Sequence, residues 1–114
     1  MDTQQPANID TTSSPEWAAL TEHQQQMQGL HLRELFAEQP NRGTEFRAQA
    51  ADLYIDYSKH RITRETLSLL MALTGRAGLR AKIDAMFAGK HINTTENRAV
   101  LHTALRQPKT ASLV

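Results

Sequence analysis

The predicted fold depends most on the stretch Asp56-Tyr57-Ser58-Lys59-His60-Arg61-Ile62-Thr63. Before it, apolar and polar residues alternate over Leu53-Tyr54-Ile55-Asp56-Tyr57, which predicts a half-buried strand. After it, the Thr63 hydroxyl is placed to cap a helix over 63–74, whose apolar face recurs at helical spacing as Leu67, Leu70, Met71 and Thr74. The stretch therefore predicts a passage from extended chain into a helix.

A second stretch, from Ile92 to Arg106, predicts the same passage. Asn93-Thr94-Thr95-Glu96 has the pattern of a capping box if Asn93 is the cap, because a carboxylate follows three residues later. A helix is then expected from about Thr95 to Arg106, and Pro108 prevents its extension. One side of this helix is apolar and consists of Val100, Leu101, Ala104 and Leu105.

Two further helices are expected nearer the N-terminus. Ser14-Pro15-Glu16 supplies a cap, a proline at the first helical position and an early carboxylate, so a helix should run to about Gln28 and end at Gly29. Its inward side chains are expected to be Trp17, Leu20 and Met27. A short helix from His31 to about Glu38 follows, with one apolar face before Pro40 formed by Leu32, Leu35 and Phe36.

The remaining signals predict a turn, a hairpin and one more helix. Phe46 is expected to close a helical turn, and the alternating strand is expected to pair with residues near Arg47–Ala50. A helix is expected over Leu79–Ala88, and Gly75 and Gly89 stand where helix C-caps favour glycine. The fold class is therefore mainly α with a short antiparallel strand pair. Its expected divisions are a disordered lead-in over 1–13, a helical region over 14–106 and a tail over 107–114.

Composition excludes several classes of function. The 114 residues suffice for one small domain. Thirteen basic and twelve acidic residues give a net charge of +1, so no global field attracts nucleic acid or an anionic membrane. The absence of cysteine excludes disulfides and thiolate chemistry. With no basic leader and no apolar run of membrane-spanning length, the chain is expected to be cytoplasmic, with neither nucleic acid nor membrane as a partner.

Several separated blocks resemble the N-terminal region of the glucose-6-phosphate isomerase family. They are Trp17-Ala18-Ala19-Leu20, His31-Leu32-Arg33-Glu34-Leu35-Phe36-Ala37, DYSKHRIT at 56–63 and MFAGKHINTTENRAVLHTALR at 86–106. These blocks follow the family's order and spacing over most of the chain. Gly43 departs from the pattern, because a large apolar residue is expected there, and the likeness ends just after Arg106. A truncated chain, a gene fragment or a shifted reading frame would each produce such an ending.

The resemblance implies that the chain is the N-terminal piece of an α/β sugar-phosphate-isomerase-type enzyme. Complete members of the family are several times longer, interconvert glucose 6-phosphate and fructose 6-phosphate in glycolysis and gluconeogenesis, and usually act as homodimers. The implied catalytic groups are a glutamate base, a histidine and a lysine at the sugar ring, and a phosphate loop rich in serine and threonine. None of these blocks matches a position here. No catalytic residue, cofactor or metal is therefore assigned, and the chain is expected to be inactive by itself.

The residues themselves offer three candidate sites. Asn93-Thr94-Thr95 would bring hydroxyls and free amides to a helix N-terminus, where phosphate can bind, although capping alone explains the same residues. Thr63 has the same two interpretations. Arg98 and His102 lie four apart on one expected helical face. They would orient a substrate, or else lie on the surface or support a neighbouring domain, and the last two are favoured. No metal site is expected, because no two histidines lie four residues apart with a carboxylate nearby; the histidines are His23, His31, His60, His91 and His102.

Two functions from different classes remain open at this point. One is the N-terminal segment of an isomerase, which would support an active site built elsewhere. The other is a small non-catalytic helical module that binds a protein partner. Trp17, Leu20 and Met27 fit a groove-binding stripe, but they fit a core better. Helices that pack on larger domains should leave apolar patches, so self-association or loose packing of the isolated chain is expected.

Overall fold

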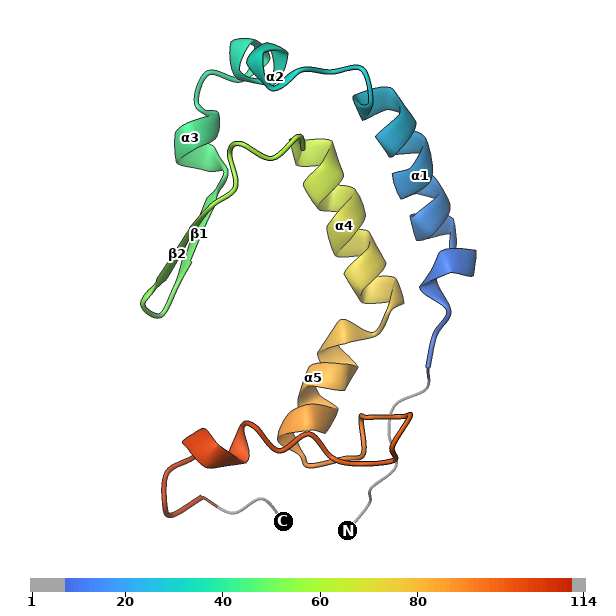
Figure 1. Ribbon diagram of the computed structural model, residues 1–114, viewed down its shortest axis with the longest axis vertical. Helices are drawn as coiled ribbons and strands as arrows, with labels where there is room; N and C mark the ends of the chain where they lie inside the picture. Colours follow the sequence, from blue (N-terminus) through green and yellow to red (C-terminus); the bar gives the residue numbers. More distant parts are fainter. Residues whose placement is uncertain (1–7, 112–114) are drawn as a thin grey trace. The chain divides into compact units, whose positions relative to one another are not determined.

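The computed structural model describes residues 8–111 of the chain. It divides into two compact units. Pro15–Met71 form one, called here the hairpin unit, and Met1–Ser14 with Ala72–Val114 form the other, called the α5 unit. Figure 1 follows the order of the elements along the chain. Most of the regular structure in the described residues is helical, with one antiparallel two-stranded sheet, which confirms the predicted fold class.

The hairpin unit begins with two helices at the predicted places. α1 covers Pro15–Met27 and is followed by a turn at Gln28 and Gly29. α2 covers Leu32–Glu38, and His31 caps it. The His31 ring nitrogen Nδ1 accepts the Arg33 N–H at 3.0 Å, and the Glu34 carboxylate accepts the His31 N–H at 2.9 Å. This is the reciprocal arrangement of a capping box, with an imidazole in place of the usual hydroxyl.

A one-turn helix leads into the hairpin. α3 covers Arg42–Glu45 and closes at Phe46, whose N–H donates to the Arg42 carbonyl at 2.8 Å. The strands β1, Arg47–Ala50, and β2, Leu53–Asp56, then pair antiparallel. The turn at Phe46 and the short hairpin are both confirmed. A Cβ placed on Gly43 would meet no atom within 4 Å outside its own turn of chain, so there is space around the position where the family pattern has a large apolar residue.

The prediction that β2 is half-buried was wrong. Every residue of both strands is exposed, and Leu53 and Ile55 keep 68% and 55% of their surface accessible. The alternation does sort apolar and polar side chains onto two faces, as the pleat requires. No described element of the hairpin unit covers the apolar face, however. An alternating pattern specifies which face is apolar and leaves open what packs on it.

α4 covers Arg64–Arg76 and continues from the hairpin unit into the α5 unit. Its predicted cap is confirmed, because the Thr63 N–H donates to the Thr66 hydroxyl at 2.9 Å and the Thr66 N–H to the Thr63 hydroxyl at 3.4 Å. The predicted C-cap at Gly75 was wrong. The helix passes through Gly75 and ends before Gly78, which takes the left-handed conformation with φ of +70°.

Two of the short elements of the α5 unit have a polar or glycine cap at one end. Asp10 caps the 3-10 helix η1, Thr11–Ser13, by accepting the Thr12 N–H at 3.0 Å. α5 covers Leu79–Phe87. At its end the Gly89 N–H donates to the Met86 carbonyl at 3.1 Å, and the Lys90 N–H to the Ala85 carbonyl at 3.0 Å. Gly89 has a φ of +75°, so this Schellman motif confirms the predicted cap.

The lead-in was expected to lack structure, yet η1 lies within it. Residues 1–7 lie outside the described part of the chain. The proposed divisions at 13 and 106 stay predictions.

The predicted helix from Thr95 to Arg106 was wrong. Backbone hydrogen bonds of 3.0 and 3.2 Å join Asn93 to Arg98 and close a tight turn there. The Asn93 side-chain oxygen accepts the Glu96 N–H at 3.2 Å and the Thr95 hydroxyl at 2.9 Å. Short polar side chains of this kind compete with helix formation. Only the 3-10 helix η2, Ala104–Arg106, remains, and a helix with no surface to pack on is marginal.

The described residues bury few large apolar side chains. The buried apolar residues are Met27, Leu35, Phe46 and the small Ala85. Met27 is inward as predicted, whereas Trp17 is 42% exposed and that part of the prediction was wrong; Leu20 is half-buried. Apolar side chains remain exposed in both units, among them Ile9, Leu53, Tyr54, Ile55, Met71, Phe87 and Leu105. No helix in the described range 8–111 is long and apolar enough to cross a membrane.

Substitution by alanine should change the free energy of unfolding in opposite directions at Gly75, inside α4, and at Gly78, just after it. Gly75→Ala adds a methyl group with no heavy atom within 4 Å, so it should raise the free energy of unfolding by about 0.5–1 kcal/mol. Gly78→Ala forces an L side chain into a positive φ and should lower it by about 1–2 kcal/mol. Urea unfolding followed by far-UV circular dichroism measures both changes. Equal effects of the two substitutions would contradict the assigned end of α4.

Candidate functional site

Arg42 is the most deeply buried polar side chain of the hairpin unit, with 1% of its surface exposed. Among the described residues, its guanidinium donates only to backbone carbonyls of the 58–62 loop. Nε and Nη2 reach the Ser58 carbonyl at 3.2 and 3.0 Å, Nη2 also reaches the His60 carbonyl at 2.9 Å, and Nη1 reaches the Ile62 carbonyl at 2.8 Å. These carbonyls belong to the stretch on which the predicted fold depends. One side chain of α3 therefore holds that whole loop.

Aromatic rings complete the surroundings of this cation. The guanidinium carbon lies 4.6 Å from the centre of the Phe46 ring and 5.5 Å from that of Phe36. Phe46 stacks in turn on Tyr57, with 5.6 Å between ring centres. Desolvation by burial lowers the pKa of Arg42 from its ordinary value, yet a guanidinium in a protein keeps its proton. The charge is therefore stabilised by carbonyl dipoles and ring faces.

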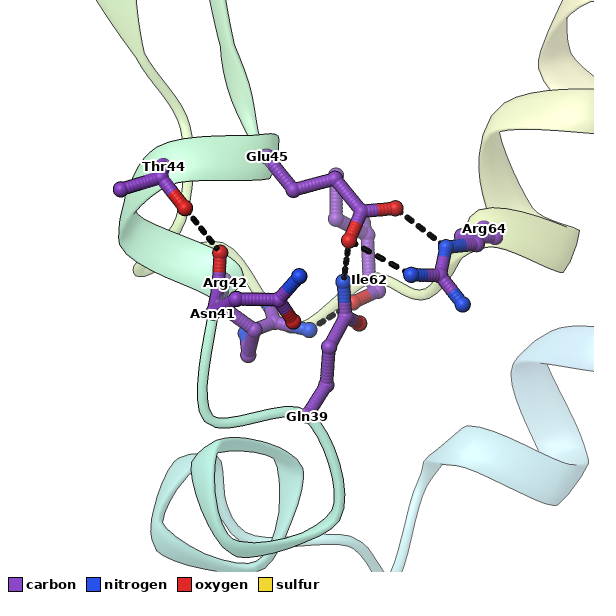
Figure 2. Close-up of polar contacts among 7 residues, drawn as sticks. All are labelled: Gln39, Asn41, Arg42, Thr44, Glu45, Ile62 and Arg64. Atoms are coloured by element: carbon purple, nitrogen blue, oxygen red, sulfur yellow. Dashed lines mark hydrogen bonds and ion pairs between the residues drawn. The ribbon is translucent and has the colours of Figure 1, made fainter.

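An ion pair fastens α3 to the start of α4. The Glu45 carboxylate accepts hydrogen bonds from Nε and Nη2 of the Arg64 guanidinium, and the Gln39 amide donates to it at 2.7 Å, as Figure 2 shows. The hydrogen bond from Arg64 lowers the pKa of Glu45, and the same bond raises the pKa of Arg64. Two-point contact between a guanidinium and a carboxylate also fixes their relative orientation.

Two contacts join α1 to the 58–62 loop and to the first turn of α4. His23, which is 5% exposed, lies with Nε2 at 2.6 Å from the Thr66 hydroxyl. Its Nδ1 has no hydrogen-bond partner among the described residues and lies 3.7 Å from the Glu65 carboxylate, an ion pair only when the ring is protonated. The Arg61 guanidinium donates to the carbonyls of Met27 and Gln28 at 3.1 and 2.8 Å. A cation there satisfies the last carbonyls of α1.

Together these contacts form a structural centre. The donors of Arg42 and Arg61 go to backbone carbonyls, and the Glu45 carboxylate is engaged by Arg64 and Gln39. Such groups position segments of backbone and are not poised for proton transfer, which needs a base within reach of a substrate. Across residues 8–111, no group of three or more His, Cys, Asp or Glu side chains is placed to hold a metal ion.

The structure does not assemble the sites considered from the sequence. Asn93-Thr94-Thr95 lies in the tight turn rather than at a helix N-terminus, so the expected helix dipole is missing. Thr63 uses its hydroxyl in the cap of α4. Arg98 and His102 are exposed and do not share a helical face, because Arg98 closes the turn and no helix spans the two residues.

The sequence analysis did not predict the buried Arg42 contacts or the Glu45–Arg64 ion pair. The partners of Arg42 are carbonyls, which every residue possesses, so no residue type near Ser58 or Ile62 signals the contact. Glu45 and Arg64 are nineteen residues apart, and only the fold brings them together. The one sequence signal that pointed toward these contacts was the predicted hairpin, because pairing its two strands brings the residues after it back toward the residues before it.

Replacing the buried guanidinium should destabilise the hairpin unit strongly. Arg42→Met keeps an apolar stem but removes the donor that the carbonyls of Ser58, His60 and Ile62 share, and should lower the free energy of unfolding by about 3 kcal/mol. Arg33→Met, on the exposed side of α2, is the control and should change it by less than about 0.5 kcal/mol. Urea titrations of both variants provide the comparison. An Arg42→Met protein as stable as the control would show that the carbonyl contacts contribute little.

The Glu45–Arg64 pair should make stability depend on pH. Since the folded-state pKa of Glu45 is lowered, its ionised form stabilises the fold above the ordinary value of 4.5, and that contribution is lost as the pH falls through the lowered pKa. Thermal unfolding between pH 3 and 6 should show a fall in midpoint that is smaller in Glu45→Gln than in the unsubstituted chain. Glu38→Gln, exposed on α2, serves as the control. Parallel curves for all three proteins would refute the assignment.

Comparison of the sequence with known proteins points to one family. A sequence model of the family described as phosphoglucose isomerase matches residues 56–114, just over half of the chain. The matched range includes 107–114, where the likeness was expected to end. The match begins at residue 56, before the 58–62 loop that Arg42 holds, so this loop lies inside the family match.

Curated proteins named glucose-6-phosphate isomerase cover nearly the whole chain. The protein from Mycolicibacterium vanbaalenii is 61% identical over 104 residues, which are 91% of this chain and 19% of that relative. The one from Mycolicibacterium smegmatis is 59% identical over 107 residues, which are 94% of this chain and 20% of the relative. Glucose-6-phosphate isomerase 1 of Rhodococcus jostii is 60% identical over 105 residues, 92% of this chain and 19% of the relative. The chain thus spans about a fifth of the length of these relatives, and it belongs to the phosphoglucose isomerase family.

Proposed function

We propose that this chain forms the N-terminal, non-catalytic segment of a glucose-6-phosphate isomerase and that the catalytic groups lie in the rest of the enzyme. The observation that carries the proposal is its coverage of the relatives. Identity near 60% extends over more than nine tenths of this chain, but over only about a fifth of each relative. The alternative of an independent interaction module is not favoured, because the relatives that cover the chain are named as isomerases.

The chemistry of the hairpin unit supports a structural role. Isomerising a sugar phosphate needs an anion site, assistance with ring opening and a base that moves a proton between adjacent carbons. Arg42 and Glu45 are engaged in holding backbone and helices in place. Under this proposal the sugar phosphate is bound, and the homodimer formed, only by the complete enzyme. A cytoplasmic location belongs to the same proposal, since the family's reaction is glycolytic.

The exposed apolar side chains also support a segment that packs within something larger. Leu53, Met71 and Leu105 keep 68%, 69% and 84% of their surface exposed. Large apolar side chains left exposed in both units are typical of surfaces that contact other protein. Self-association or loose packing of the isolated chain stays a prediction on the same grounds.

A hybrid enzyme tests the proposed function. This chain replaces the matched segment of the Mycolicibacterium smegmatis isomerase, and conversion of glucose 6-phosphate is measured for the hybrid, the parent enzyme and the isolated chain. The hybrid should show activity of the same order as the parent, and the isolated chain should show none. The parent enzyme without the segment is the control and should be inactive. Activity of the isolated chain, or an inactive hybrid, would contradict the proposal.

A further inference from the structure

The hairpin has two chemically different faces. Ala48 pairs with Ile55 and Ala50 with Leu53, and residues directly opposite one another point to the same side of a sheet. This side, called here the apolar face, consists of Ala48, Ala50, Leu53 and Ile55. The other side carries the pairs Arg47–Asp56 and Gln49–Tyr54 and is mostly polar. The hairpin therefore has the pattern of a sheet that is covered on one side.

The apolar face has no cover within the hairpin unit. All four of its residues are exposed, and Leu53 is the most exposed of the large apolar side chains of the unit apart from Met71. The base of the hairpin is nevertheless fixed. Phe46 precedes β1 and stacks on Tyr57, which follows β2, and the Tyr57 N–H donates to the Phe46 carbonyl at 3.0 Å. Figure 1 shows the hairpin extending beyond α3 from this base. These two contacts fix the orientation of the apolar face relative to the base of the hairpin.

We propose that the apolar face of the hairpin docks against an aliphatic surface of the remaining four fifths of the isomerase chain, an inference that rests on the proposed function. The length of the relatives supplies the occupant, because about four fifths of each lies outside the match with this chain. The chemistry fits a packed helix or sheet. Two alanines beside a leucine and an isoleucine form a small surface without charge, on which another backbone can approach closely.

The size of the face favours an occupant within the same chain over a second copy. Stable association of separate proteins usually buries about 800 Å² on each partner. Four residues, two of them alanine, offer much less. A segment of the same polypeptide needs far less contact area, because covalent linkage keeps its effective concentration high. The small apolar face is therefore suited to intramolecular docking.

Hydrogen exchange of the hairpin amides tests the docking. The isolated chain and the hybrid enzyme are compared by mass spectrometry over peptides that contain β1 and β2. Exchange in the hybrid should be slower by about 100-fold or more, because covering Leu53 and Ile55 suppresses opening of the hairpin. In the hybrid, Leu53→Ser with Ile55→Ser should restore fast exchange, whereas Tyr54→Ser, on the other face of the same strand, should not.

Each outcome separates this inference from the proposed function. An active hybrid whose hairpin exchanges as fast as in the isolated chain would overturn the docking and leave the proposed function standing. An inactive hybrid would overturn the proposed function itself. Protection in the isolated chain that rises with its concentration and disappears in Leu53→Ser with Ile55→Ser would assign the face to a second copy, against the inference.

Discussion

The guanidinium of Arg42 is the interaction on which the hairpin unit depends. Removing a cation from water costs several kcal/mol, and among the described residues Arg42 has no carboxylate to offset that cost. Four hydrogen bonds to three carbonyls and the faces of two rings replace the lost hydration. Because the carbonyls are those of Ser58, His60 and Ile62, the same contact sets where the hairpin ends and where α4 begins. The Phe46–Tyr57 stack and the Glu45–Arg64 pair build outward from it.

Local signals predicted the elements near this centre well. Pro15 at the first position of α1, the cap at Thr63 and the glycine at position 89 each act within one turn of chain, so the sequence alone specifies them. The predicted helix from Thr95 to Arg106 failed for a physical reason. Its capping signal and its apolar stripe were present, but the Asn93 side chain stabilises a turn just as well, and Leu105 has no surface to pack on.

Tertiary contacts could not be predicted in the same way. A buried arginine bound by carbonyls looks in sequence like an exposed one, and the His23–Thr66 contact joins residues forty-three apart. The alternation in β2 indicated an apolar face but not its exposure, because burial depends on what lies opposite. The sequence patterns of this chain thus describe surfaces prepared for packing, while the described structure covers only some of them. A segment that makes up about a fifth of its relatives accounts for both facts.

The most direct test of this account is the mass of the native protein in cells that carry its gene, measured by immunoblot with an antibody raised against the 114-residue chain. The account predicts a band several times larger than 12.8 kDa, because the apolar surfaces would then be covered within a complete isomerase. A single band at 12.8 kDa, with no larger species, would contradict it and would show that the chain functions with these surfaces uncovered or bound to another protein.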